Sequence, residues 1–335
     1  MLRAVRSRLG PGRGMSQNRI AGVGVGGLNG RWFAIGGGRK SLWPWLVLLV
    51  AGVGWGFSFS LAKIAAIGGA HPLGITFWQC TTGAALMIAF TRTRSRAQTM
   101  KHGPIWLYVA CGLLGLVIPN TAFFYAASRV SAGVLAITIA IVPILTYAVS
   151  AGCGLERLVL VRVTGVICGA ISIMLLFAPT ESLPDPSQSL WLLLAFGSAA
   201  CYAAMNIVLA IHMPEDKSTL RVTSGMFVAA ALMMLPIVFA TDSFVPIAWP
   251  PRAAEWATLG LGVNSAICYG LYIYLVNHAG PVFGSQTANV VTLSGVIWGI
   301  IIFGDRHSLW IWLSLVTMLT ALALVAPREK EALAP

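Results

Sequence analysis

Long apolar runs alternate with short polar breaks along the whole chain beyond residue 42. Ten of the runs have about 20 residues each, which is the length that an α-helix needs to cross the hydrocarbon core of a bilayer. They cover residues 43–67, 72–91, 104–127, 131–151, 158–178, 189–211, 220–240, 252–277, 281–303 and 308–326. The breaks carry charged residues, proline or glycine. This pattern predicts an all-α integral membrane protein with ten transmembrane helices.

The composition excludes a soluble protein. Of the 335 residues, 57% are hydrophobic and only 10% are charged, whereas a soluble domain has about 25% charged residues. The net charge of +12 would suggest a nucleic-acid partner in a soluble chain. Here the positions of the basic residues explain that charge, so we predict the lipid bilayer as a partner and no nucleic acid.

The basic residues lie mostly on one side of the predicted spans. With the N-terminus in the cytoplasm, 18 Lys and Arg residues fall inside and 3 fall outside, namely Arg129, Arg252 and Arg306. Without the N-terminal segment the ratio is still 10 to 3. The positive-inside rule therefore predicts that both termini are cytoplasmic.

Two terminal segments lie outside the spans. Residues 1–42 form a basic, glycine-rich tail without acidic residues, and residues 327–335 form a second cytoplasmic tail. The N-terminal segment has no apolar stretch long enough for a signal peptide. A flexible tail, a transit peptide and a true start at Met15 all remain open for it.

The two halves of the chain repeat one pattern, which divides it into residues 43–178 and 189–326. At a constant offset of 149 residues, Tyr125 corresponds to Tyr274, and Glu156 and Arg157 correspond to Asp305 and Arg306. Five spans are an odd number, so the second repeat is inserted upside down. Inverted repeats are typical of secondary transporters, in which two equivalent halves exchange inward and outward shapes.

Four stretches resemble one known family. They are "WGFSFSLAK" (55–63), "IVPILTYAVSAGCGLER" (141–157), "RVTGVICGAISIMLL" (162–176) and "AGPVFGS" (279–285). In order and spacing the chain is similar to the drug/metabolite transporter superfamily, specifically to its ten-helix EamA-type carriers. The resemblance covers about residues 43–326. It implies a carrier of small metabolites in the inner (plasma) membrane, with a central cavity lined mainly by spans 1–4 and 6–9.

Three positions depart from the family pattern. Thr292 stands where the repeat of Pro143 would place proline, and Ser314 stands where Gly165 would predict glycine. The acid at the end of the second repeat is Asp305 and not glutamate. These departures bear on subfamily and substrate more than on the fold.

Lys63 is the only charged residue between Trp43 and Ala70. It lies in the outer half of span 1, about 12 Å from the midpoint. On a helical wheel it shares a face with Gly52, Gly56 and Phe59, and small residues at such spacing usually pack against another helix. Lys63 therefore either faces a cavity, where it could bind a substrate carboxylate, or extends to the outer interface.

Other polar or aromatic residues at membrane depth are candidates for substrate binding, because a polar group in lipid costs free energy. With Lys63, the predicted substrate-binding residues are Trp55, Gln79, Asn120, Asn264, Tyr269, Gln286 and Asn289. For each of them, packing between helices is the competing interpretation.

Prolines within the spans and charged residues at the span ends suggest hinges and gates. Pro119 in span 3 and Pro143 in span 4 predict kinks, and Pro143 is interpreted as a hinge. Glu156 and Asp305 end spans 4 and 9 on opposite sides of the membrane, each directly before an arginine. We predict gating or structural roles for Pro143, Glu156 and Asp305, with a solvated turn as the alternative for the two acids.

The residues that proton-coupled drug antiport, metal binding or ATP hydrolysis would need are absent from this sequence. All ten acidic residues fall outside the span centres, which argues against an antiporter that exchanges protons for cationic drugs at an intramembrane carboxylate. The six cysteines lie singly in apolar segments, and the chain has no Walker motif. We therefore predict no catalytic residues, no metal site, no cofactor and no enzyme activity.

The predicted function is secondary transport of small metabolites by alternating access, with export of amino acids or related compounds first. Uptake or exchange of sugars or nucleosides is the alternative substrate class. A membrane channel or an integral-membrane enzyme is the alternative protein class. A small-molecule substrate is the expected partner, and a homodimer stays open.

Overall fold

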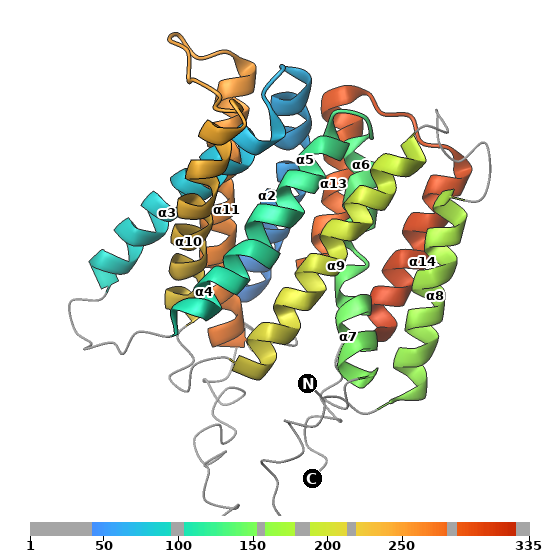
Figure 1. The fold of residues 1–335 in the computed structure, drawn as a ribbon. Coiled ribbons are helices and arrows are strands. Elements are labelled where there is room, and N and C mark those ends of the chain that lie inside the picture. Colours follow the sequence, from blue (N-terminus) through green and yellow to red (C-terminus); the bar gives the residue numbers. More distant parts are fainter. Residues whose placement is uncertain are drawn as a thin grey trace, which may run out of the picture. The chain divides into compact units, whose positions relative to one another are not determined.

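The computed structural model describes residues 42–94, 104–152, 158–177, 188–212, 219–279 and 287–325. Within these ranges the chain forms helices and their connections, and no strand. The chain separates into a unit Met1–Leu42 and a unit Trp43–Pro335. The described helices all belong to the second unit, which is drawn in colour in Figure 1.

The first repeat contains five spans. Span 1 is α2 (Trp43–Ile67), span 2 is α3 (Pro72–Arg94) and span 5 is α8 (Leu160–Phe177). Span 3 consists of α4 (Ile105–Gly112), the π-helical turn η2 (Leu113–Val117) and α5 (Ile118–Ala127), and span 4 consists of α6 (Ala132–Ile139) and α7 (Val142–Gly152).

The second repeat also contains five spans. They are α9 (Gln188–His212), α10 (Thr219–Ala240), α11 (Ala253–Ala279), α13 (Thr287–Phe303) and α14 (Leu309–Val325). Each of the ten predicted spans thus corresponds to one or more helices. The span predicted over residues 252–277 corresponds to α11, which continues two residues further, to Ala279.

Spans 3 and 4 are interrupted in their middles. In span 3, the N–H of Ile118 donates to the carbonyl of Leu113, five residues back, directly before Pro119. In span 4, Ala140 and Ile141 leave the α-helical pattern, and their N–H groups donate to the carbonyls of Ile137 and Thr138, two residues before Pro143. Because proline cannot donate and crowds the preceding turn, each interruption lies where the sequence predicts a kink.

The helices have the length and surface of membrane spans. By length and composition six stretches can cross a membrane, and three shorter apolar helices accompany them. The six are Trp43–Ile67, Pro72–Arg92, Ile105–Ala127, Ala132–Gly152, Gln188–Leu209 and Leu220–Ala240. Large apolar side chains such as Leu232 and Ile301 are about two-thirds exposed, at 65% and 66%. An apolar surface of this kind fits lipid and not water.

The helix contacts follow a two-fold pattern. α2 packs against α11 and α13, and its counterpart α9 packs against α5 and α7. The contact of α3 with α11 is repeated by that of α10 with α4. Equivalent helices meet in the pairs α3–α10, α6–α13 and α8–α14. The fold is therefore an all-α membrane protein built from two inverted five-helix repeats.

One end of the unit carries four described connections, and we call it the upper end, as drawn in Figure 1. The connections span residues 68–71, 128–131, 241–252 and 304–308. The connection at residues 241–252 is held to α3, because the Nε1 of Trp78 donates to the carbonyl of Val245 at 2.7 Å. The opposite, lower end holds the start of α4 and the end of α9, where the rings of Trp106 and His212 lie 4.8 Å apart.

Candidate substrate site

A cavity of about 610 Å³ lies between the two repeats. Its walls come from all ten spans, with few contributions from α8 and α14. Its upper boundary is formed by Phe59 of α2 and Phe123 of α5, whose ring centroids lie 5.4 Å apart. From there the cavity extends to Arg162 and Thr287, which lie near the lower ends of α8 and α13.

A chain of hydrogen bonds crosses the cavity wall and joins four helices. The amide of Gln79 donates to Ser265 Oγ at 2.9 Å, and the amide of Asn120 donates to Gln79 Oε1 at 2.8 Å. The hydroxyl of Tyr202 donates to Asn120 Oδ1. Gln79, Asn120 and Ser265 are buried. Because each amide is held by the next residue, the polar groups are presented to the cavity in fixed orientations.

Aromatic rings form a second part of the wall. The ring of Trp55 meets that of Tyr269 edge-on at 5.2 Å between centroids and lies 5.6 Å from that of Tyr272. Tyr269 in turn packs edge-on against Phe227 at 5.6 Å. Trp55, Tyr269 and Tyr272 all line the cavity. The predicted mid-membrane position of Trp55 thus coincides with an aromatic, amphipathic surface.

Equivalent positions of the two repeats meet at this site. Asn120 and Tyr269 are 149 residues apart, and Trp55 and Tyr202 are 147 residues apart. The first helix of each repeat therefore brings an aromatic residue to the third helix of the other repeat, as Trp55–Tyr269 and Tyr202–Asn120. The two contacts differ in chemistry, and only one of them carries an amide.

The lower part of the cavity contains a cation. The Arg162 guanidinium lies over the ring of Tyr147 at 5.4 Å from its centroid. Nearby, the amide of Asn206 donates to Thr146 Oγ1 at 3.3 Å. Among the described residues that line the cavity, Arg162 is the one with a full charge.

Tyr202 and Arg162 were missed as site residues by the sequence analysis. Tyr202 looks like an ordinary apolar-helix tyrosine, and Arg162 was counted only as a topology signal at the start of span 5. Their cavity positions depend on how helices pack across the repeats. The constant offset of 149 residues pairs Trp55 with Ala204, whereas aligning the starts of the two repeats at residues 42 and 189 pairs it with Tyr202.

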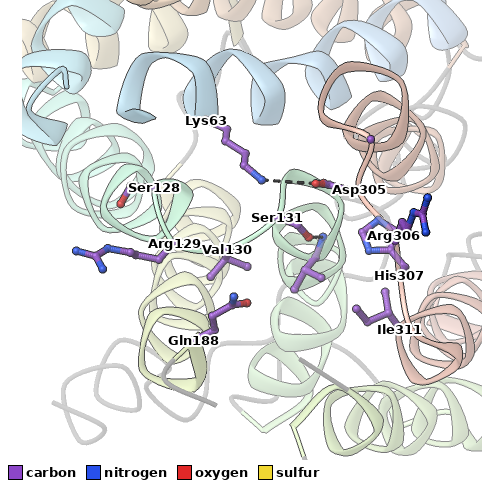
Figure 2. A pocket seen from close by; sticks show the side chains of 12 residues that line it. Lys63, Ser128, Arg129, Val130, Ser131, Gln188, Asp305, Arg306, His307 and Ile311 are labelled. Carbon is purple, nitrogen blue, oxygen red and sulfur yellow. Dashed lines mark hydrogen bonds and ion pairs between the residues drawn. The ribbon is translucent and has the colours of Figure 1, made fainter. Parts of the chain in front are cut away.

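Lys63 lies in a second, smaller pocket at the upper end, shown in Figure 2. Its Nζ is 3.6 Å from Asp305 Oδ1 and 4.7 Å from the centroid of the Phe303 ring. Lys63 does not line the large cavity, but Phe59, one turn below it on α2, does. The lysine thus does have an acidic neighbour, which comes from the other repeat.

The glycine face of α2 accounts for the position of Lys63. A Cβ on Gly52 would meet Val290 at 2.5 Å, and a Cβ on Gly56 would meet Ser294 Oγ at 2.1 Å. These glycines let α2 lie directly against α13. Lys63, on the same face, then reaches the segment that follows α13, where Gly304 has a φ of +65° and turns the chain towards Asp305.

The other predicted residues separate into three groups. Asn289 and Pro143 line the large cavity. Asn264 does not line it, because its amide donates to the Gly54 carbonyl and to Ser58 Oγ, both at 2.7 Å, and so joins α11 to α2. Gln286 and Glu156 lie outside the described residues.

Together, two helical repeats around a polar and aromatic cavity define the class of a multi-pass membrane transporter. The EamA-like transporter family matches residues 42–178 and 189–326. The chain therefore belongs to the EamA-like transporter family, and it is a membrane transporter of small molecules.

Solved structures share the fold. Significant matches include 25 chains. One of them is a crystal structure that is 18% identical in sequence, with a TM-score of 0.58 over 88% of this chain and 100% of the other. At this identity the likeness shows the fold alone. A search of curated proteins gave no significant match.

Proposed function

We propose that the protein is a secondary transporter that works by alternating access and exports amino acids or related small metabolites. One observation carries the mechanism. The large cavity reaches the lower ends of the helices, whereas Phe59 and Phe123 bound it above. Above these rings, Ala62, Ala126 and Val130 are at most 1% exposed. A cavity that lies towards one end and is bounded by packed rings at the other fits one of the two states that such a carrier needs.

The cavity chemistry supports the substrate class. The amides of Gln79 and Asn120 and the hydroxyl of Ser265 can hydrogen-bond a polar solute, while Trp55 and Tyr269 can contact an apolar part. Arg162 adds a positive charge that suits a carboxylate. An amino acid has all three features, whereas a neutral sugar or nucleoside lacks the carboxylate that would form an ion pair with the arginine.

For the orientation we propose that the upper end faces outwards in the plasma membrane, with both termini in the cytoplasm. The three basic residues that the positive-inside rule assigned to the outside are Arg129, Arg252 and Arg306. All three belong to upper-end connections. The cavity described here would then lie towards the cytoplasm, which is the side from which an exporter loads.

The test combines a resistance screen with counterflow. A host that expresses the protein is challenged with toxic concentrations of amino acids, amines, nucleosides and sugars. The protecting solutes are then tested in proteoliposomes. We expect preloaded unlabelled amino acid to accelerate entry of the labelled form. Flux without this acceleration would indicate a channel, product formation would indicate an enzyme, and exchange restricted to sugars or nucleosides would overturn the proposed substrate.

A further inference from the structure

The upper pocket is a separate cavity of about 400 Å³. Pockets that bind small molecules typically measure about 300–1,000 Å³. Its wall combines Lys63 from α2, the turn at residues 128–131, Gln188 at the start of α9, and the connection at residues 304–307. Four separate parts of both repeats therefore converge on it, and none of its lining residues lines the large cavity.

The ion pair between Lys63 and Asp305 inside this pocket is long. Their separation of 3.6 Å exceeds the 2.7–2.9 Å of a charge-assisted hydrogen bond. The second carboxylate oxygen, Asp305 Oδ2, is buried and has no hydrogen-bond partner among the described residues. The two side chains are only 15% and 12% exposed. Charges that are buried but incompletely satisfied are costly unless something else pairs with them.

The other titratable groups near Lys63 and Asp305 do not supply a further ionic partner for either of them. Figure 2 shows the side chains of Arg129 and Arg306 directed away from the pair, in opposite directions. Arg129 lies over the Trp191 ring at 5.6 Å. Burial lowers the pKa of His307, although Asp305 acts in the opposite direction, so this imidazole is neutral at pH 7. The interior of the pocket thus offers one positive and one negative group, side by side.

One residue of the pocket corresponds to a residue of the large cavity in the other repeat. Ile311, which lines it, is 149 residues after Arg162, which lines the lower part of the large cavity. At this position the first repeat lines the large cavity and the second repeat lines the upper pocket. Lys63 has no charged counterpart in the second repeat, because Ala210 stands at its position when the starts of the two family matches, residues 42 and 189, are aligned.

From this geometry we propose that the upper pocket is a second binding site, at the outer mouth, for the α-ammonium and carboxylate groups of a zwitterion. Lys63 binds the carboxylate, and the Asp305 carboxylate, which lines the pocket, accepts hydrogen bonds from the ammonium group. The ligand inserts between two charges that are 3.6 Å apart and replaces their weak contact with two stronger ones. As an export step, this inference rests on the proposed function, while the binding itself does not.

The test places a reporter in the pocket of the full-length protein in lipid nanodiscs. Gln188→Cys, in a background without native cysteines, is labelled with N-ethylmaleimide. Glycine serves as the probe because it is the smallest molecule with both groups, and acetate and methylammonium each carry one. We expect glycine to slow labelling, and the fragments to need at least about tenfold higher concentration at equal ionic strength.

Variants assign the effect to the pair. Lys63→Met and Asp305→Asn are each expected to weaken glycine protection about tenfold or more. Arg306→Gln removes a charge from the same pocket lining and is expected to leave protection unchanged. The exchange Lys63→Asp with Asp305→Lys restores both groups and is expected to restore protection, which separates loss of binding from loss of folding.

Two results would overturn the proposal. One is the absence of glycine protection in the reporter protein, and the other is equal protection by acetate or methylammonium alone. The variant Asn120→Leu distinguishes this site from the large cavity, since it is expected to lose transport and to keep glycine protection. Protection without transport of any solute would refute the proposed function and leave the binding site intact.

Discussion

The side chain of Asn120 is held on both sides in the wall of the large cavity, because it donates to Gln79 and accepts from Tyr202. Replacing it with leucine, which has a similar shape, leaves two buried polar groups without partners, at a cost of about 1–3 kcal/mol for each group. We expect Asn120→Leu to lower the counterflow rate at least about tenfold and to lower the melting temperature.

A matched amide separates transport from stability in this experiment. Asn264 also bridges two helices, α11 and α2, but does not line the cavity. Asn264→Leu should therefore lower the melting temperature and leave the KM for substrate unchanged. Equal losses of transport in folded protein of both variants would contradict a substrate role for Asn120.

Arg162 allows a prediction about substrate charge. If it binds a carboxylate from the lower end, Arg162→Gln should raise the KM for amino acids about tenfold or more, whereas Arg162→Lys should have a smaller effect. The KM is measured in inside-out vesicles. Amino acid methyl esters lack the negative charge, so their KM should differ little between the wild type and the two variants. A rise in KM for the esters as large as that for the amino acids would contradict this role.

At the residue scale the sequence predicted which residues lie at membrane depth, but not which side of a helix they occupy. It placed Trp55, Gln79, Asn120, Tyr269 and Asn289 at membrane depth, and all five line the cavity. It could not distinguish these from Asn264, because a helix that is apolar on every side has no amphipathic face to indicate where a polar residue points. Lys63 and Asp305 are far apart in sequence, and their proximity depends on how α2 packs against α13.

At the scale of elements, glycines set how closely helices approach. A Cβ on Gly262 of α11 would lie 1.5 Å from Thr82 Oγ1 and 3.0 Å from the backbone oxygen of Gln79. Gly262→Ala should therefore destabilise the protein by about 1–3 kcal/mol through overpacking. The free energy is measured by denaturant titration in detergent micelles.

The control is a glycine on the same helix. A Cβ on Gly270 would meet no atom within 4 Å. Gly270→Ala should be neutral or should stabilise the protein by up to about 1 kcal/mol, because alanine is the better helix former. A cost at Gly270 as large as that at Gly262 would show that close packing is not the cause.

The element boundaries were largely predictable, and one departure from the family pattern now has a structural reason. Ser314, at the position equivalent to Gly165, donates to the carbonyl of Ser172 at 2.9 Å, and Ser172 donates to the carbonyl of Ser314 at 2.8 Å. The serine thus joins α14 to α8. The breaks inside spans 3 and 4 follow from proline, but the π-turn in one and the two-residue gap in the other depend on tertiary packing.

At the scale of the whole molecule, orientation is the property to test first. Ser128 is exposed at the upper end, whereas Leu209 lines the cavity towards the lower end. In intact cells, we expect an impermeant maleimide to label Ser128→Cys, and to label Leu209→Cys only after permeabilisation. The reverse pattern would invert the proposed topology and turn the cavity to the outside.

The repeat was predictable from sequence because its order of helices, turns and acid–arginine pairs survives at a constant offset. The arrangement of the repeats was not. Which helices meet across them depends on shape complementarity between faces with little sequence likeness, such as the glycines of α2 against Val290 and Ser294.

The different charged residues at the lower end of the large cavity and in the upper pocket have a thermodynamic consequence. Arg162 at the lower end corresponds to Ile311, and Lys63 at the upper end corresponds to Ala210, so the inward and outward states need not bind substrate with equal strength. In a carrier without a coupled ion, a closed cycle requires that any such difference in affinity be offset by the preference of the empty protein for one state. Sequence divergence between the repeats would then determine where the empty carrier rests, and the solute gradient alone would determine the direction of net flux.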